Sequence, residues 1–262
     1  MFVLALSLAA GPALAEDKLR DFCGDRPGIG TPACTVDAGH LQVELGLGDW
    51  TLDRQPGSRA DTIAADDFSL RYGLGNTTEL RLDWTAVNYA RTRDRASGAI
   101  DRTRGVGDVT LGIKQNLLNP DGSGLSLALL PYASLPAGKD GIGAGDWGAG
   151  LIVPANYVID EIFSLELTSE IDAAVDGDGH GRHLAYGSVL GLQAKLGEKA
   201  GIAAEVQAIR DNDPAGHSTQ TLAGLSVTYL VEKQTQLDLG ANAGLNHVSP
   251  DVEIYFGISR KF

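Results

Sequence analysis

Four aspartates stand where charged side chains could control the passage of ions. Asp67, Asp108 and Asp146 each open a segment of alternating polar and apolar residues, and Asp172 closes another. Two of them follow a Gly-x-Gly sequence, Gly105-Val-Gly-Asp108 and Gly143-Ala-Gly-Asp146. Rings of carboxylates select cations in membrane pores. We therefore predict that Asp67, Asp108, Asp146 and Asp172 surround the mouth of a pathway for a solute or ion.

Further charged residues share the parity of these aspartates within the alternating segments. Together, the polar parity carries twelve carboxylates and five bases. They could line an acidic pathway, or they could merely pair across strands in a plugged interior, because a small barrel has little free space. The residues that we assign to this interior are Glu79, Arg81, Asp83, Lys114, Glu166, Glu170, Glu205 and Asp238.

Catalysis would need a nucleophile, a base and an orienting group held together. The sequence contains five histidines but no Gly-x-Ser-x-Gly or His-Glu-x-x-His motif. His180 and His183 share a short segment with Asp176 and Asp178, which is either a metal-binding loop or a solvated one. The Gly-x-Gly sequences precede alternating residues rather than the helix that a nucleotide loop requires. We expect a protein that is not an enzyme and that uses no cofactor or metal.

Alternation with a period of two dominates the chain from Gly39 onward and is typical of β-strands. Within 162–173, for example, Leu165 and Leu167 alternate with Glu166 and Thr168. The even number of segments and their lengths near ten residues match a transmembrane β-barrel. The twelve predicted strands are 40–49, 66–74, 78–88, 107–117, 124–136, 146–158, 162–173, 183–196, 200–210, 218–231, 235–246 and 252–262.

The connections between these strands alternate in length. Short turns lie at 75–77, 119–122, 160–161, 197–199 and 232–234, and longer loops at 50–65, 89–106, 137–145, 174–182 and 211–217. Outer-membrane barrels pair short periplasmic turns with long external loops. The predicted fold is therefore all-β, a 12-stranded antiparallel transmembrane barrel over residues 39–262, located in the bacterial cell outer membrane.

Aromatic residues and the last strand support a membrane barrel. Two aromatic girdles are expected at the two membrane interfaces. The last strand alternates and ends in Phe262, which resembles the C-terminal signature read by the barrel-assembly machinery. We expect this machinery and outer-membrane lipid as partners. The girdle residues are Tyr157, Phe163, Tyr229 and Phe262 near the short turns, and Phe68, Trp84, Trp147 and Tyr186 near the long loops.

The N-terminal residues predict a signal peptide followed by a short segment with a disulfide. Residues 1–15 contain an apolar run and the Ala13-Leu-Ala15 cleavage pattern of a signal peptide, without the usual preceding positive charge, so the true start could lie upstream. Residues 16–38 form a Gly/Pro-rich segment that we expect to lie in the periplasm. It contains both cysteines of the chain, Cys23 and Cys34, and an oxidising compartment predicts a disulfide between them.

Two segments resemble a known family. They are Phe22-Cys-Gly-Asp-Arg-Pro-Gly-Ile-Gly-Thr-Pro-Ala-Cys-Thr-Val-Asp-Ala-Gly-His40 and Gly105-Val-Gly-Asp-Val-Thr-Leu-Gly-Ile-Lys114. Both are similar to bacterial outer-membrane transporters of the phenol-degradation meta-pathway family. The resemblance covers essentially the mature chain and implies a channel or carrier for small aromatic or other organic compounds. It brings no binding residues to carry over.

Two local features add separate hypotheses. The segment 90–104 contains five arginines, which either bend inward onto the acidic mouth, bind lipopolysaccharide phosphates, or stay solvated. Pro131 and Pro154 interrupt neighbouring predicted strands, where proline removes a donor from the hydrogen-bond ladder. They predict a lateral gap in the barrel wall or a filled bulge. The arginines are Arg91, Arg93, Arg95, Arg102 and Arg104.

The charge balance limits the function. A net charge of −13 argues against nucleic acid as a partner, because phosphate binding needs a basic face. We predict an outer-membrane channel or transporter that passes small molecules by passive diffusion through an acidic lumen. The alternative is a closed structural or adhesion-type barrel without transport.

Overall fold

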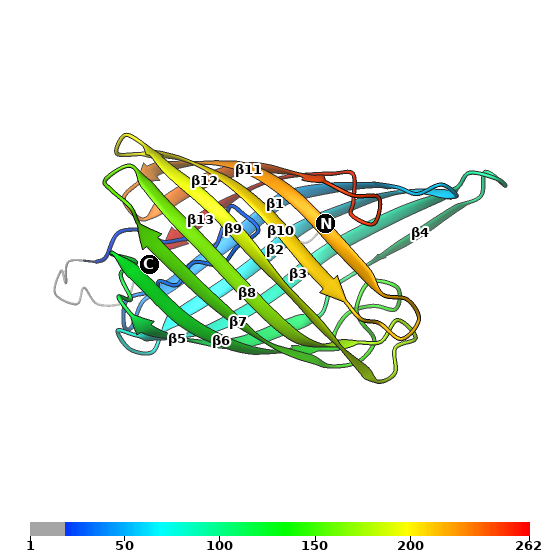
Figure 1. Cartoon of the computed structure of the whole chain (residues 1–262), viewed down its shortest axis with the longest axis horizontal. Coiled ribbons are helices and arrows are strands. Elements are labelled where there is room, and N and C mark those ends of the chain that lie inside the picture. The colour runs from blue at the N-terminus through cyan, green and yellow to red at the C-terminus, as the bar shows by residue number, and fades with distance from the viewer. Residues whose placement is uncertain (1–18) are drawn as a thin grey trace.

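The computed structural model describes residues 19–262 as a single antiparallel β-sheet closed into a barrel (Figure 1). Each strand pairs with its neighbours in the sequence, except that β5 pairs with β3 instead of β4, and the first strand closes on the last. The strands are β1 (Leu41–Arg54), β2 (Ser58–Gly73), β3 (Thr78–Asp94), β4 (Ile100–Gly105), β5 (Val109–Leu118), β6 (Leu125–Leu135), β7 (Gly148–Val158), β8 (Phe163–Val175), β9 (Arg182–Leu196), β10 (Ala200–Asp211), β11 (Ser218–Glu232), β12 (Thr235–Gly244) and β13 (Val252–Lys261).

The barrel wall consists of twelve transmembrane strands, although the chain has thirteen strand segments. Both β4 and β5 pair with β3. The C-terminal part of β3 pairs with β4, and its N-terminal part pairs with β5. The register continues from one to the other, since Asn88 pairs with Gly105 and Trp84 with Val109. The two segments are thus one interrupted strand. The predicted 12-stranded antiparallel barrel is confirmed.

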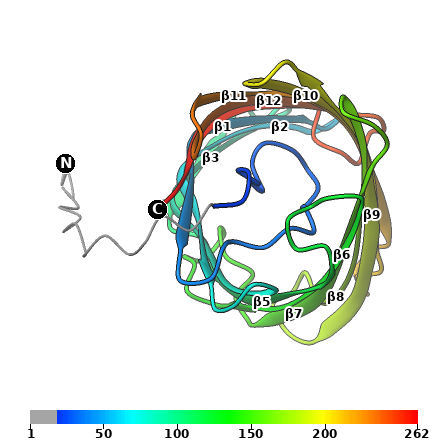
Figure 2. The same ribbon diagram turned by 90° about the vertical axis from the view of Figure 1, so that its left-hand side faces the viewer.

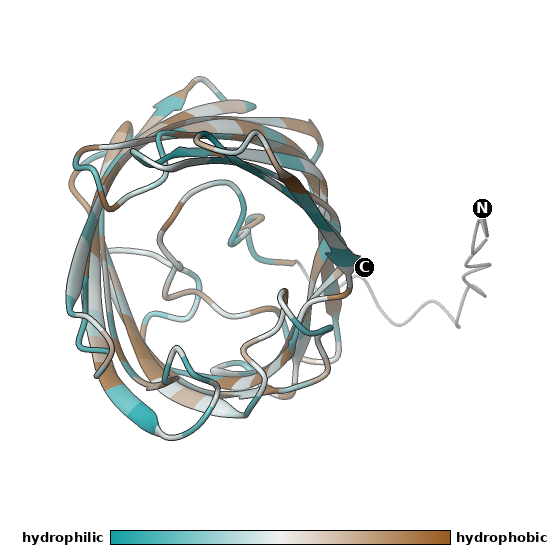
Figure 3. Cartoon of the chain, turned by 90° about the vertical axis from the view of Figure 1, so that its right-hand side faces the viewer, coloured by the Kyte–Doolittle hydropathy of each residue, from teal (hydrophilic) through white to brown (hydrophobic). Residues whose placement is uncertain are grey.

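The two faces of the sheet are opposite in character to those of a soluble barrel. Large apolar side chains such as Leu167, Leu190 and Phe256 are exposed on the outside. Arg71 and Glu79, by contrast, are completely buried inside. Outward apolar residues suit lipid, and inward polar residues suit a polar lumen. The alternation along the strands is visible in Figure 3.

Two of the predicted loops are wrong. Residues 50–54 and 58–65 extend β1 and β2, while 89–94 and 100–105 extend β3 and form β4. These extensions project beyond the rest of the barrel as a β-arm (Figure 1, right). The arm has polar residues on both faces, as in Arg91-Thr-Arg-Asp94, so no apolar stripe revealed the strands. Pairing with neighbouring strands satisfies its backbone instead.

We predicted a periplasmic segment over residues 16–38, of which the structure describes residues 19–38. Residues 19–38 run inside the lumen (Figure 2). We call residues 19–38 the plug. They lie toward the end of the barrel that carries the short turns, because they contact residues near that end of the strands, such as Gln42 and Asn116. The predicted signal peptide, 1–15, lies outside the described residues.

The C-terminal residue belongs to the closing seam of the barrel. The backbone N–H of Phe262 donates to Leu41 over 2.8 Å, next to the pairing of β1 with β13. Recognition of Phe262 by the assembly machinery stays a prediction. Within residues 19–262 there is no helix long and apolar enough to cross a membrane.

Candidate functional site: the lumen and its plug

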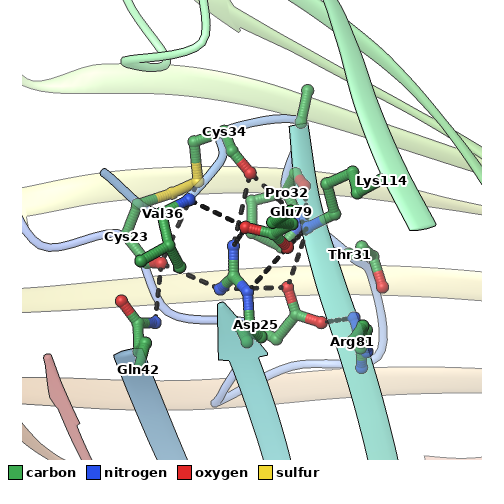
Figure 4. A network of polar contacts seen from close by, with 12 residues as sticks. Cys23, Asp25, Thr31, Pro32, Cys34, Val36, Gln42, Glu79, Arg81 and Lys114 are labelled. Atoms are coloured by element: carbon green, nitrogen blue, oxygen red, sulfur yellow. Dashed lines mark hydrogen bonds and ion pairs between the residues drawn. A yellow bond between two sulfur atoms is a disulfide. The ribbon is translucent and has the colours of Figure 1, made fainter. Parts of the chain in front are cut away.

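A disulfide shapes the plug. Cys23 and Cys34 are bonded, with 6.6 Å between their Cα atoms, so the chain between them forms a closed loop inside the barrel (Figure 4). Their backbone carbonyls point at cations of the wall: Arg71 donates to Cys23 over 3.0 Å and to Cys34 over 3.3 Å. The disulfide therefore fixes two acceptors that wall residues bind.

Arg71 on β2 is the centre of a buried ion-pair cluster. Its Nε donates to Glu79 Oε1 over 2.9 Å, and Nη1 donates to Glu44 Oε1 over 3.0 Å. All three side chains are fully shielded from solvent. A guanidinium presents five donors in a fixed plane, which lets it hold two carboxylates and two carbonyls together.

The carboxylates of this cluster also bind plug N–H groups. Glu79 accepts from Val36 over 2.7 Å, and Glu44 accepts from Asp25 and Arg26 over 3.0 and 2.8 Å. Buried carboxylates are stable only when paired and hydrogen-bonded. The plug thus supplies donors that the wall alone does not.

Lys114 and Arg81 join the cluster to Asp25 of the plug. Lys114 Nζ lies 3.3 Å from Glu79 and donates to the Pro32 carbonyl over 3.1 Å. Asp25 contacts Arg81 directly and lies 3.5 Å from both Arg71 and Lys114. Asp83 in turn pairs with Arg81 at 2.7 Å. Four of the predicted lumen residues, Glu79, Arg81, Asp83 and Lys114, therefore meet around one plug carboxylate (Figure 4 labels three of them).

The opposite wall holds the tip of the plug. Glu205 on β10 accepts from the N–H of Ile29 and of Gly30, the latter over 2.9 Å. Thr168 on β8 both accepts from Thr31 N–H and donates to its carbonyl. A side chain at Gly30 would overlap the Glu166 carboxylate, which would then have to move away from the plug. Close approach of backbone to wall is what glycine permits.

Arg26 attaches the plug to β12 and β13. Its guanidinium pairs with Asp238 at 3.0 Å and lies 5.6 Å above the ring of Tyr255. Gln236 donates to its backbone carbonyl over 2.8 Å. Asp238, another predicted lumen residue, thereby becomes a plug contact.

Asp37 anchors the C-terminal end of the plug at the short-turn rim. Its carboxylate pairs with Lys261 at 2.8 Å and with Arg20 at 2.9 Å. Partial burial by itself would raise the pKa of Asp37, but the hydrogen bonds from Lys261 and Arg20 outweigh it and lower the pKa to about 2. The carboxylate is therefore ionised at any physiological pH.

Two cavities lie beside the plug. The larger, of about 440 Å³, is bounded by plug residues 28–31 and by Leu130, Tyr132 and Ile152 of the wall. The smaller, of about 250 Å³, lies toward Asp49, Glu253 and Tyr255. Both cavities are lined by Arg26, Gly28, Ile29 and Asp67. They are therefore adjacent spaces separated by the plug.

The four predicted mouth aspartates do not form one free ring. Asp67 lines both cavities, and Asp172 accepts from Tyr132 over 2.5 Å. Asp108, however, accepts from the N–H groups of Gly138 and Ala144, so it holds the β6–β7 loop. Asp146 pairs with Arg182 at 3.0 Å. The repeated Gly-x-Gly-Asp sequence reflects loop anchoring at these two positions.

The remaining predicted lumen carboxylates do face the interior. The Tyr132 hydroxyl, which has a single proton to donate, lies 2.7 Å from Glu170 as well as 2.5 Å from Asp172, and Gln193 donates to Glu166 over 2.6 Å. Among residues 19–262, Glu166, Glu170, Glu205 and Asp172 have no ion-pair partner. The interior on this side keeps an excess of carboxylates.

The two prolines leave the strand register unchanged. Leu127 pairs with Ala155 and Leu130 with Ile152, so β6 and β7 continue in step past Pro154 without a bulge. Pro131 pairs with Leu151, which places the prolines three residues out of line rather than opposite each other. Between these pairs, Ala128 and Leu129 form no ladder pair with β7. A lateral gap stays a prediction.

His183, near the start of β9, lies between the β8–β9 loop and the end of β10, at the end of the barrel opposite the short turns. Its Nδ1 is 2.9 Å from Asp176 and its Nε2 is 3.0 Å from Asp211. No three metal-ligating side chains group together in the described part of the chain. The contacts join the β8–β9 loop to β10.

Sequence reasoning missed the plug residues Asp25, Arg26 and Asp37 and the wall residue Tyr132. One signal was available in the sequence. Charged side chains that point fully inward, such as Arg71 and Glu44, need partners. An interior with an excess of carboxylates therefore requires hydrogen-bond donors from another part of the chain. The disulfide-closed N-terminal segment, rich in Gly and Pro, was the unassigned source of backbone donors.

A closed antiparallel barrel with an apolar outside and a charged interior is an outer-membrane β-barrel, and the protein belongs in the bacterial outer membrane. The family described as "Putative MetA-pathway of phenol degradation" matches residues 24–262, and the chain belongs to it. This confirms the family resemblance.

Solved structures share the fold at low sequence identity. An outer-membrane channel of the COG4313 group from Pseudomonas putida F1 has 16% identity and a TM-score of 0.70, over 90% of this chain and 99% of that one. The NanC porin has 9% identity and a TM-score of 0.54, over 85% and 100%. The translocator domain of the autotransporter NalP from Neisseria meningitidis has 13% identity and a TM-score of 0.54, over 86% and 89%. No curated protein sequence matches the chain.

Proposed function

We propose that the protein is a channel that lets small solutes cross the outer membrane by passive diffusion past the plug. The observation that carries this proposal is the pair of adjacent cavities, about 440 and 250 Å³, between the plug and the wall. The larger lies in the range of about 300–1,000 Å³ typical of small-molecule sites. The names of the similar channel and porin point the same way.

The lining of the larger cavity suits small organic compounds, including aromatic ones. Leu130, Ile152 and Ile29 offer apolar surface, and the Tyr132 ring lies beside them. Asp67 and Arg81 add polar groups at other parts of the lining. A mixed surface of this kind holds an apolar ring and also a hydroxyl or amine on it. The family description, which refers to phenol degradation, supports the same class of solute.

The charge of the lumen favours cations over anions. Arg71, Lys114, Arg81 and Arg26 are engaged with carboxylates. Glu170 and Asp172, which have no ion-pair partner within residues 19–262, and Asp67 at the cavities leave negative potential near the route. Charges along a narrow pore select by sign.

Planar-bilayer recordings test the proposal. The purified protein should give stepwise conductance, and the reversal potential across a KCl gradient should have the sign of cation preference. Glu170→Gln with Asp172→Asn should reduce that preference, whereas Asp121→Asn in an exposed short turn should not. Anion preference would refute the acidic route. Proteoliposomes should in parallel take up a monoaromatic solute faster than protein-free vesicles.

The plug itself favours a second candidate, a closed structural barrel without transport. Its backbone occupies donors and acceptors on β1, β2, β3, β8, β10 and β12, which fixes it firmly in the lumen. A protein that gives no conductance and no solute uptake in the same experiments would favour this candidate.

A further inference from the structure

The β-arm concentrates positive charge in an acidic protein. The arm and its two hairpin turns span residues 50–65 and 89–105. They contain seven of the fourteen arginines of the chain, against four aspartates, in a protein of net charge −13. The sequence alone left three fates open for five of these arginines. The structure distinguishes between them by the face on which each side chain lies.

Cross-strand pairing sorts the arm residues into two faces, because directly paired residues point to the same side. One row joins Trp50, Ile63, Tyr89 and Arg104. The next rows on that face join Leu52, Asp61, Arg91 and Arg102, and then Arg54, Arg59, Arg93 and Ile100. Six arginines and a single aspartate therefore share one face.

This face is the outer one. Trp50 pairs with Ile254, an exposed residue in the apolar band that faces lipid. Its neighbour Thr51 pairs with Glu253, which accepts from Asn242 in the lumen. The arginines therefore point away from the barrel axis. The inner face of the arm carries Asp53, Asp94 and Asp101 and no arginine, as the row Asp53, Ala60, Thr92, Asp101 illustrates.

Several of the outer arginines have no ion-pair partner among the described residues. Asp61 pairs with Arg59 at 2.8 Å and lies 3.8 Å from Arg91, and Arg54 pairs with Asp251. Arg93, Arg102 and Arg104 are exposed and form no ion pair within residues 19–262. Neighbouring arginines on adjacent strands present planar guanidinium groups, whose N–H donors match the spacing of phosphate oxygens.

The position of the arginines relative to the membrane identifies the anion. Trp50 and Tyr89 lie in the first row of the arm, and such aromatic residues mark the boundary between hydrocarbon and headgroups. Arg104 lies in that row, and the other five outer arginines lie in the two rows beyond it. Their guanidinium groups stand at and just above the headgroup level of the outer leaflet.

We infer that the outer face of the arm binds lipopolysaccharide through its phosphate groups, with Arg91, Arg93, Arg102 and Arg104 as the principal contacts. Charge complementarity carries the assignment: an anionic, phosphorylated glycolipid surrounds a barrel at this height, and the rest of the protein is acidic. The inward alternative, arginines folded onto the mouth, conflicts with the outward direction of every paired arginine in the arm.

Binding of purified lipopolysaccharide to the protein in detergent tests this assignment. Replacing Arg91, Arg93, Arg102 and Arg104 with Gln should weaken binding by about fivefold per arginine, the effect of one basic residue at an anionic membrane surface. The matched control is Asp53→Asn with Asp101→Asn, which changes charge on the opposite face of the same strands and should not weaken binding. Dephosphorylated lipopolysaccharide should bind the wild-type protein as weakly as native lipopolysaccharide binds the arginine variant.

Three results would overturn the assignment. They are full binding by the arginine variant, equal binding of dephosphorylated lipopolysaccharide, and equal competition by phosphatidylglycerol micelles, which would indicate a general anionic surface. Heat-modifiable gel migration identifies variants that fold. If the fourfold variant does not fold, Arg102→Gln and Arg104→Gln on β4 provide the same comparison singly.

Discussion

Arg71 and Glu79 are joined by two hydrogen bonds, of 2.9 and 3.2 Å, deep inside the barrel. Both residues also bind the plug, one as a donor and the other as an acceptor. Arg71 donates to the carbonyls of Cys23 and Cys34, and Glu79 accepts from Val36 N–H. One ion pair on the wall therefore recognises both donors and acceptors of the plug backbone.

Removing the positive charge of Arg71 should lower the free energy of unfolding. Arg71→Met leaves Glu44 and Glu79 buried with much of their positive partner lost, and breaking a buried pair in this way costs about 3–5 kcal/mol. We expect a matching loss of stability in urea unfolding, read from heat-modifiable migration. Arg260→Met, at a surface pair that is more than half exposed, should change stability by less than about 0.5 kcal/mol. Equal effects would show that the cluster does not hold the structure.

Gly30→Ala should loosen the tip of the plug. A Cβ at this position would overlap the Glu166 carboxylate, whereas a Cβ at Gly57 would meet open space. The Ile29 N–H, which donates to Glu205, should therefore exchange with deuterium faster in the Gly30→Ala variant than in wild type, and Gly57→Ala should match wild type. Protection that is the same in all three would mean that the fit of residue 30 against Glu166 does not hold the tip of the plug in place.

Asp37 predicts a defined pH window for the end of the plug. Its folded pKa is about 2, below the ordinary value of 3.8, so its contribution is present above about pH 4 and is lost as the pH falls toward 2. Asp37→Asn should lower stability by about 1 kcal/mol at pH 6, less than the full shift because solvent screens the site. The difference from wild type should shrink as the pH falls from 4 to 2 and should vanish below pH 2. A gap that stays undiminished between pH 4 and pH 2 would assign the effect to something other than this carboxylate.

The two prolines on β6 and β7 allow a test of the lateral-gap hypothesis. Ala128 and Leu129 lack ladder partners on β7 next to the buried Pro154. Replacing Pro131 and Pro154 with Val should restore pairing there and slow uptake of an apolar solute without changing ion conductance. Uptake that is unchanged, with intact conductance, would argue that solutes do not leave through this part of the wall.

The strand pattern of the membrane region was predictable because one physical rule governs it. Lipid outside and polar contacts inside force strict alternation, as in Leu165, Glu166, Leu167 and Thr168, which the structure places on opposite faces. Where lipid ends, that rule ends. Residues Arg91 to Asp94 extend β3 in water, and their sequence carries no signal that distinguishes an extended arm from a loop.

The identity of the partners of inward charges was harder to predict. Parity placed Glu79, Lys114, Glu205 and Asp238 in the lumen, but it does not say whether they meet each other, water or another segment. Their partners are largely the backbone and side chains of residues 25–36, which have no periodic pattern. Asp108 shows the same difficulty, because parity did not predict that its carboxylate accepts from the backbone N–H groups of Gly138 and Ala144 at 2.7 Å.

Plug contacts span the seam where the sheet closes on itself. Arg26 donates from its backbone to Glu44 on β1 and pairs with Asp238 on β12, and Asp37 pairs with Lys261 on β13. An empty barrel would leave Glu44 and Glu205 without the N–H donors that they now have. We expect the first described residues of the chain to enter the lumen before or while the first and last strands meet, because the closed barrel depends on their donors. A chain that has lost this segment should then accumulate on the assembly pathway as an open sheet.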